Sequence, residues 1–186
     1  RNNFFFRTGQ QSGDVAIGLA DSPNSQVLNN TVFMSGTYSS PIEYRFTGTT
    51  GAVIANNITD GIIAARDGAT ASLASNLVGA RADLFVNAAT GDLHLAARAA
   101  SAIDRGTTLG TVTDDWDGQL RPQGAGYDIG ADEVGATTAS LQIGGRVADG
   151  STGAPFANVS LALSGARTST AMSDASGGYA FPGLAG

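Results

Sequence analysis

One short stretch of this 186-residue chain gathers many of the side chains that could bind a metal or move protons. The segment DDWDGQLRPQGAGYDIGADE, residues 114–133, contains six carboxylates and one arginine, Arg121. Asp115 and Asp117 alternate before a glycine, as ligands do in calcium-binding loops. An EF-hand loop also needs a glycine at its sixth position and a glutamate at its twelfth, but counting from Asp115 these positions hold leucine and glycine. Calcium at Asp115 and Asp117 is therefore the less favoured hypothesis.

The favoured hypothesis for the same segment is a structural network. The guanidinium of Arg121 can bridge neighbouring carboxylates with two parallel hydrogen bonds. Short aspartate side chains can hold turns by accepting hydrogen bonds from nearby backbone N–H groups. The predicted members of the network are Asp115, Asp117, Arg121, Asp128 and Asp132.

His94 is the only histidine, and the chain has no cysteine. One imidazole without thiolates cannot make a usual structural zinc site. A serine triad also lacks its GxSxG nucleophile motif. We therefore predict a structural role for His94, and no catalytic or cofactor-binding residue in this chain.

The charge pattern excludes two classes of partner. The net charge is −6, there is no lysine, and the ten arginines are scattered singly. Nucleic-acid binding needs a basic stripe that neutralises phosphates. No apolar run approaches the ~20 residues of a membrane helix. We expect neither nucleic-acid binding nor membrane insertion.

A repeat organises the first part of the chain. Asparagine pairs occur at residues 2–3, 29–30 and 56–57, a spacing of 27, and Ser75-Asn76 is a weaker copy. Each pair precedes a short β-type run and is bounded by turn-forming residues. Such a period predicts a solenoid, in which Asn30 and Asn57 hydrogen-bond to their equivalents in neighbouring coils about 4.8 Å away. The alternative is that the pairs mark hairpin turns of an ordinary β-sandwich.

These repeats resemble the right-handed parallel β-helix of the pectin-lyase-like superfamily. A second set of motifs resembles the carboxy-terminal end of secreted bacterial proteins of that kind: GDLHL, ASAIDRG, DWDGQLRP and DIGADE, within residues 91–133. The resemblance implies the last coils and the terminal cap of a β-helix over residues 1–135. In such a cap, Trp116, Leu120, Tyr127 and Ile129 would be apolar plugs over the end of the solenoid.

The sequence after residue 140 has a different texture. Alternating runs in SLQIGGRV and NVSLALSG flank the turn ADGSTGAPFA, and TSTAMSDASGGYAFPGL follows. This pattern resembles carboxypeptidase-regulatory-like or Cna-B-type modules. The resemblance implies a truncated, prealbumin-like β-sandwich over residues 140–186, so the predicted fold class is all-β throughout.

Two functions remain open from the sequence. The first is a non-catalytic, adhesin-like region of a secreted or cell-surface bacterial protein, which presents its surface to glycans or other cells. The second is the non-catalytic end of a polysaccharide lyase or glycoside hydrolase whose active site lies upstream. Both imply an extracellular location, with polysaccharides or cell-surface glycans as partners.

Overall fold

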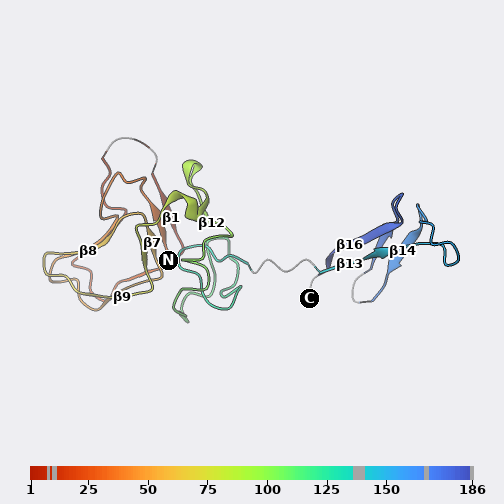
Figure 1. Cartoon of the computed structure of the whole chain (residues 1–186). Coiled ribbons are helices and arrows are strands. Elements are labelled where there is room, and N and C mark those ends of the chain that lie inside the picture. Colours follow the sequence, from red (N-terminus) through yellow and green to blue (C-terminus); the bar gives the residue numbers. More distant parts are fainter. Residues whose placement is uncertain (8, 10–11, 136–140, 166–167, 185–186) are drawn as a thin grey trace. The chain divides into compact units, whose positions relative to one another are not determined.

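The computed structural model describes residues 1–7, 9, 12–135, 141–165 and 168–184, and the chain divides into two compact units, residues 1–135 and 136–186 (Figure 1). Within the described ranges the regular elements are β-strands and two short 3₁₀ turns, without an α-helix. The all-β prediction is confirmed. In the same ranges, no helix has the length and apolar character needed to cross a membrane.

Unit 1 contains a four-stranded parallel sheet in the order β1-β4-β7-β10, which we call the first sheet. Its strands are β1 (Phe4–Phe6), β4 (Thr31–Phe33), β7 (Ile58–Thr59) and β10 (Leu77–Val78). Phe4 is in register with Thr31, Thr31 with Ile58, and Ile58 with Leu77. The residues that follow each asparagine pair are therefore neighbours across this sheet.

Two further parallel sheets of unit 1 have three strands each, in the orders β2-β5-β8 and β3-β6-β9. The second sheet contains β2 (Ile17–Ala20), β5 (Ile42–Arg45) and β8 (Ile63–Arg66). The third contains β3 (Gln26–Leu28), β6 (Ala52–Ala55) and β9 (Ala71–Ala74). The chain passes through the three sheets in a fixed rotation, and Figure 1 shows β7, β8 and β9 on three sides of unit 1.

The identification of unit 1 as the end of a right-handed parallel β-helix of the pectin-lyase-like superfamily is corrected. The strands form separate sheets of two to four strands, and in the described part of the chain no ladder joins these sheets into a closed solenoid. The repeat spacing and the alternating runs specify parallel pairing at equivalent positions. They do not specify how neighbouring sheets are joined. The sequence therefore supports an all-β fold with parallel strands, but not a closed solenoid.

Alternate residues of the first sheet enter two different cores. Val32 and its neighbour Phe5 pack with Ile42 and Ile54 on one face. Phe33 and Ile58 pack on the other face. Since successive strand side chains point to opposite faces, short apolar runs such as FFF and TVF supply both cores.

Residues 82–105 cover the second of these faces. They form the 3₁₀ turn η1 (Ala82–Leu84), β11 (Phe85–Asn87), the 3₁₀ turn η2 (Ala88–Thr90) and β12 (Asp92–Leu95), and β11 pairs with β12 antiparallel. Phe85, Leu93 and Leu95 are buried against Phe33 and Ile58. Residues 82–105 therefore cover one face of the first sheet.

Residues 106–133 extend this lateral cover. Gly130 approaches the first sheet so closely that a Cβ atom there would lie 2.6 Å from Ile58 Cδ1, and its φ of +107° disfavours other residues. Trp116 is 49% exposed and Leu120 is 70% exposed, whereas Tyr127 and Ile129 are buried. The prediction that Trp116 and Leu120 are apolar plugs is wrong, because this segment runs along the side of the sheets.

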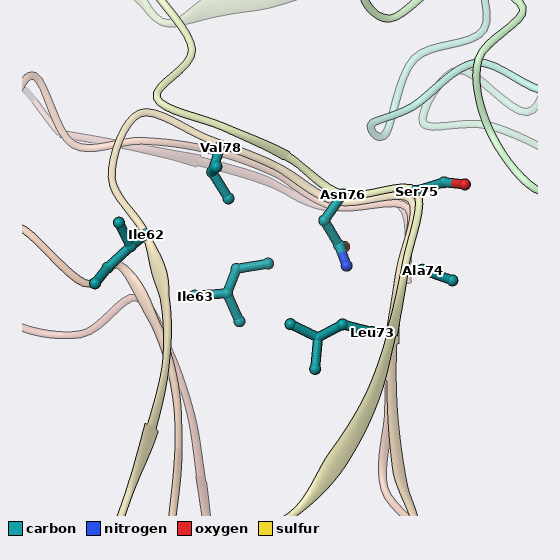
Figure 2. A pocket seen from close by; sticks show the side chains of 7 residues that line it. All are labelled: Ile62, Ile63, Leu73, Ala74, Ser75, Asn76 and Val78. Carbon is teal, nitrogen blue, oxygen red and sulfur yellow. The ribbon is translucent and has the colours of Figure 1, made fainter.

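One end of the three parallel sheets, formed by the edge strands β8, β9 and β10, has exposed apolar side chains (Figure 2). Ile62, Leu73 and Val78 are all exposed there. A shallow hollow at this end is lined by Ile62, Ile63, Leu73, Ala74, Ser75, Asn76 and Val78. In the described part of the chain, residues 106–133 leave this end uncovered.

Unit 2 contains two antiparallel pairs of strands. In the first pair, β13 (Leu141–Arg146) lies beside β16 (Gly178–Leu184). In the second, β14 (Ser160–Leu163) lies beside β15 (Ser169–Met172). Phe181 is buried and packs edge-on against Tyr179, with ring centroids 5.9 Å apart. These small sheets establish the β character of unit 2 and no finer class.

Candidate functional site

The lateral cover of unit 1 brings a histidine, three aspartates and a tryptophan together. We call the group formed by Asp92, His94, Trp116, Asp117 and Asp132 the His94 corner. Asp92 and His94 lie two residues apart in β12, so their side chains share one face of the strand. His94 Nδ1 lies 2.5 Å from Asp92 Oδ1, and His94 Nε2 lies 3.0 Å from Asp117 Oδ2.

Asp132 is the third carboxylate of the corner and the most buried, with 5% of the residue exposed. Its Oδ2 atom accepts a 2.7 Å hydrogen bond from the Leu95 N–H, which ties residue 132 to the end of β12. One ligating atom each of His94, Asp117 and Asp132 lies within 4.8 Å of the others. These three side chains have the types and the proximity that a metal ion requires.

The Trp116 ring of the corner packs against the rings of Phe4 and His94. Trp116 stacks on Phe4 with a centroid distance of 4.8 Å and an interplanar angle of 14°. The His94 ring meets Phe4 and Trp116 edge-on, at 5.2 and 5.4 Å. The backbone N–H of Trp116 donates a 2.8 Å hydrogen bond to the Ala131 carbonyl, so both the backbone and the ring of Trp116 are held in place. Trp116 is thus an exposed aromatic surface with a fixed orientation.

The charges of the corner depend on one another. Partial burial opposes the charged form of His94, but the hydrogen bond with Asp92 and the nearby carboxylates of Asp132 and Asp117 outweigh it and raise the pKa of His94. The hydrogen bond from His94 lowers the pKa of Asp92. Burial raises the pKa of Asp132. Among the described residues of the corner, His94 is the one basic side chain that faces these carboxylates.

The predicted members of the acidic network lie in two places, around Arg121 and in the His94 corner. Arg121 and Glu133 form a fully buried ion pair, Nη1 to Oε2, at 2.6 Å. Arg121 also donates from Nη2 to the Gly130 carbonyl at 2.9 Å and from Nε to the Asp114 carbonyl at 2.9 Å. Glu133 was not among the predicted residues, although it lies in the same acidic stretch.

Asp115 and Asp128 hold turns around this ion pair. Asp115 Oδ1 accepts hydrogen bonds from the N–H groups of Asp117 and Gln119, and its Oδ2 accepts one from Glu133 N–H. Asp128 accepts 2.7 Å hydrogen bonds from Asp104 N–H and Val134 N–H. Burial raises the pKa of Asp128 to about 6. Asp117 and Asp132 belong to the His94 corner instead, so the hypothetical calcium pair Asp115 and Asp117 is divided between two environments.

Asn30 and Asn57 lie in a ladder that crosses the parallel strands. Asn30 Nδ2 donates to Asn57 Oδ1 at 2.9 Å, and Asn57 Nδ2 donates to Asn76 Oδ1 at 2.9 Å. Asn3 continues the ladder to the other side, with its Nδ2 donating to Asn30 Oδ1 at 2.9 Å. Asn30 and Asn57 are both buried.

The first asparagine of each pair does not belong to this ladder and has a different structural role. Asn2, Asn29 and Asn56 have φ values of 56°, 49° and 55°, the left-handed region that asparagine tolerates. Their side chains donate to carbonyls of the lateral segment: Asn2 to Asp114, Asn29 to Gly130 and Asn56 to Thr107. These contacts attach the segment that carries Trp116 and Asp117 to three successive strand turns.

Besides Glu133, sequence reasoning missed the buried carboxylate of Glu43 in β5. It is 1% exposed and accepts hydrogen bonds from Tyr38 Oη at 2.9 Å and Arg45 Nε at 2.7 Å. Arg66 Nη1 lies 3.3 Å from Glu43 Oε1. Arg45 and Arg66 are in register across β5 and β8, and this recurrence in the repeat was the available signal.

The stability of unit 1 is expected to depend on Glu43 in acid. Burial opposes its charge, but the hydrogen bonds from Arg45 and Tyr38 outweigh that effect and lower the pKa of Glu43 below its ordinary value of 4.5. The charged Glu43 carboxylate therefore stabilises the folded state above pH 4.5, and this stabilisation is lost as the pH falls through the lower pKa of the folded state. The difference in Tm between the wild type and Glu43→Gln should therefore be largest near neutral pH and should shrink in acid.

The measurement is a Tm series against pH, with the two proteins compared at each pH. Asp128 contributes in the opposite direction, because a raised carboxyl pKa gives stability that is lost as pH rises through about 6. That contribution is common to both proteins and cancels in the difference. A Tm difference that stays constant from neutral pH into acid would contradict this role of Glu43.

No family model, curated protein or solved structure matches this chain. The assignments to the pectin-lyase-like superfamily and to carboxypeptidase-regulatory-like or Cna-B-type modules are therefore corrected for both parts of the chain. The quoted motifs are short, so their order alone does not establish membership in a family.

Proposed function

We propose that this chain is part of an extracellular, non-catalytic scaffold that binds neutral glycans at the exposed ring of Trp116. The observation that carries the proposal is the Trp116 ring, 49% exposed and stacked on Phe4 beside His94. An apolar ring face next to hydrogen-bonding groups suits a sugar, which has an apolar C–H face and a rim of hydroxyls.

The fixed position of Trp116 supports binding. Its backbone N–H is bonded to the Ala131 carbonyl, and its ring rests on Phe4. A ring that is already held loses little conformational freedom when a ligand stacks on it. Asp117, the next residue, is exposed and presents a carboxylate that can accept hydrogen bonds from sugar hydroxyls.

Charge narrows the class of glycan. The chain carries a net charge of −6, and Asp92, Asp117 and Asp132 gather beside Trp116. Uronates and sulfated sugars would be repelled by these carboxylates. We therefore assign neutral hexose or hexosamine glycans as the ligand class, and the extracellular location is part of the same proposal.

The finer description of the fold is part of the same proposal. The fixed rotation of strands through three parallel sheets supports a stack of similar coils in unit 1. The two antiparallel pairs of unit 2 support part of a β-sandwich. Stacked coils make a stiff scaffold, since each coil is bound to its neighbours along its length.

The test is affinity electrophoresis of the full chain through gels containing neutral polysaccharides. We expect the wild type to be retarded by at least one of them, and Trp116→Ala to lose at least about tenfold in affinity, as removal of an aromatic anchor does. Leu120→Ala is the matched control, because Leu120 is an exposed apolar residue of the same segment. Equal retardation of wild type and Trp116→Ala would contradict the proposal.

A further inference from the structure

We propose that His94, Asp117 and Asp132 bind one divalent transition-metal cation of the zinc class. The inference goes beyond glycan binding and does not depend on it. One potential ligand atom from each residue lies within 4.8 Å of the others. The three residues come from β12 and from two places in the lateral segment, which the fold fixes against each other.

The spacing of the side chains suits coordination. His94 Nε2 and Asp117 Oδ2 are 3.0 Å apart. Two ligands that are each about 2.1 Å from a tetrahedral zinc ion lie roughly 3.4 Å from one another. Small rotations of these side chains would therefore admit the ion between them.

The second observation is the burial of Asp132. This carboxylate is about nineteen-twentieths buried, at 5% exposure, and in the described part of the chain it forms no ion pair with an arginine. Its Oδ2 atom accepts a hydrogen bond from Leu95 N–H. Buried carboxylates are normally paired with a cation or bound to a metal. In the described part of the chain, the basic group beside Asp132 is therefore the imidazole of His94, which Asp132 shares with Asp92 and Asp117.

The charge balance of the whole His94 corner also favours a bound cation. Asp92, Asp117 and Asp132 face one imidazole, so a negative excess remains even when His94 is protonated. Asp92 and Asp117 likewise pair only with His94 among the described residues. A divalent cation at the centre would neutralise the two ligating carboxylates.

The groups around the three ligands are arranged as in protein metal sites. Asp92 Oδ1 lies 2.5 Å from His94 Nδ1, so the Nδ1–H can donate to Asp92 and leave the Nε2 lone pair for a metal. The Leu95 N–H orients Asp132 in the same way. One imidazole with two carboxylates favours zinc or manganese, whereas calcium prefers six or more oxygen ligands.

The test is isothermal titration of the chelator-treated full chain with zinc chloride near neutral pH, without glycan. We expect one site in the wild type, and no saturable binding in His94→Gln or Asp117→Asn. Asp92→Asn should weaken zinc binding about 10–100-fold, as loss of a group that orients a ligating histidine does. Asp83→Asn is the matched control, because Asp83 is an exposed carboxylate outside the corner.

Circular dichroism would show that each variant is folded, and Asp117→Asn serves if His94→Gln is not, since Asp117 is exposed. Absence of zinc binding by the wild type would overturn the proposal and would mean that a proton alone links His94 to Asp117. Unchanged binding by Asp117→Asn or by folded His94→Gln would also overturn it. Because the assay contains no glycan, failure of the glycan proposal leaves this result unaffected.

Discussion

Replacement of Arg121 by alanine is expected to lower the free energy of unfolding of unit 1 by about 3–5 kcal/mol. The side chains of Arg121 and Glu133 are both fully buried, and they pair at 2.6 Å. Removing the guanidinium leaves the Glu133 carboxylate buried without its cation and the Gly130 and Asp114 carbonyls without their donors. The cost reflects these groups left unpaired, rather than the net value of the pair itself.

The measurement is urea unfolding of the full chain, followed by tryptophan fluorescence. Trp116 is the only tryptophan, so the signal reports on unit 1. Arg98→Ala is the matched control, because Arg98 is exposed, and its replacement should change the unfolding free energy by no more than about 0.5 kcal/mol. An Arg121→Ala protein as stable as Arg98→Ala would show that the buried network does not hold the lateral segment.

Replacement of Asn57 by alanine is expected to destabilise unit 1 by about 3 kcal/mol, since each buried group left unpaired costs about 1–3 kcal/mol. Asn57 Nδ2 donates to the Val27 and Ala55 carbonyls and to Asn76 Oδ1. Its Oδ1 accepts from both nitrogens of Asn30. Alanine would leave these partners inside the fold without replacement, because Asn57 has no exposed surface.

Asn3 offers a matched control at the end of the same ladder. It donates to Asn30 Oδ1 but is exposed, so water can replace its bonds. Asn3→Ala should therefore cost about 1 kcal/mol or less in the same urea experiment. If Asn57→Ala and Asn3→Ala were equally stable, the ladder would be a surface feature without a structural role.

The all-β class could be predicted because the repeat is visible in short stretches of the sequence. Residues 27 apart, such as Thr31 and Ile58, occupy the same register position in adjacent strands. A local pattern does not contain the contacts between distant segments. Nothing in the period indicates that residues 106–133 lie against the side of the first sheet, so Trp116 and Leu120 were wrongly expected to be plugs.

The His94 corner could not be predicted for the same reason. The alternation of β12 places Asp92 beside His94, and this pair is readable from the sequence. Asp117 and Asp132 arrive from later turns of the lateral segment, held by contacts such as Leu95 N–H to Asp132. The acidic stretch indicated that carboxylates would gather, but the division of its members between Arg121 and His94 depends on the packed structure.

Fluorescence titration of the full chain with neutral oligosaccharides tests the central claim most directly, since its single tryptophan is the proposed binding surface. The account predicts a saturable change in Trp116 emission with at least one neutral glycan, and none with uronate oligomers of equal length. An emission spectrum that stays unchanged across the neutral glycans, or that changes only with uronates, would contradict it.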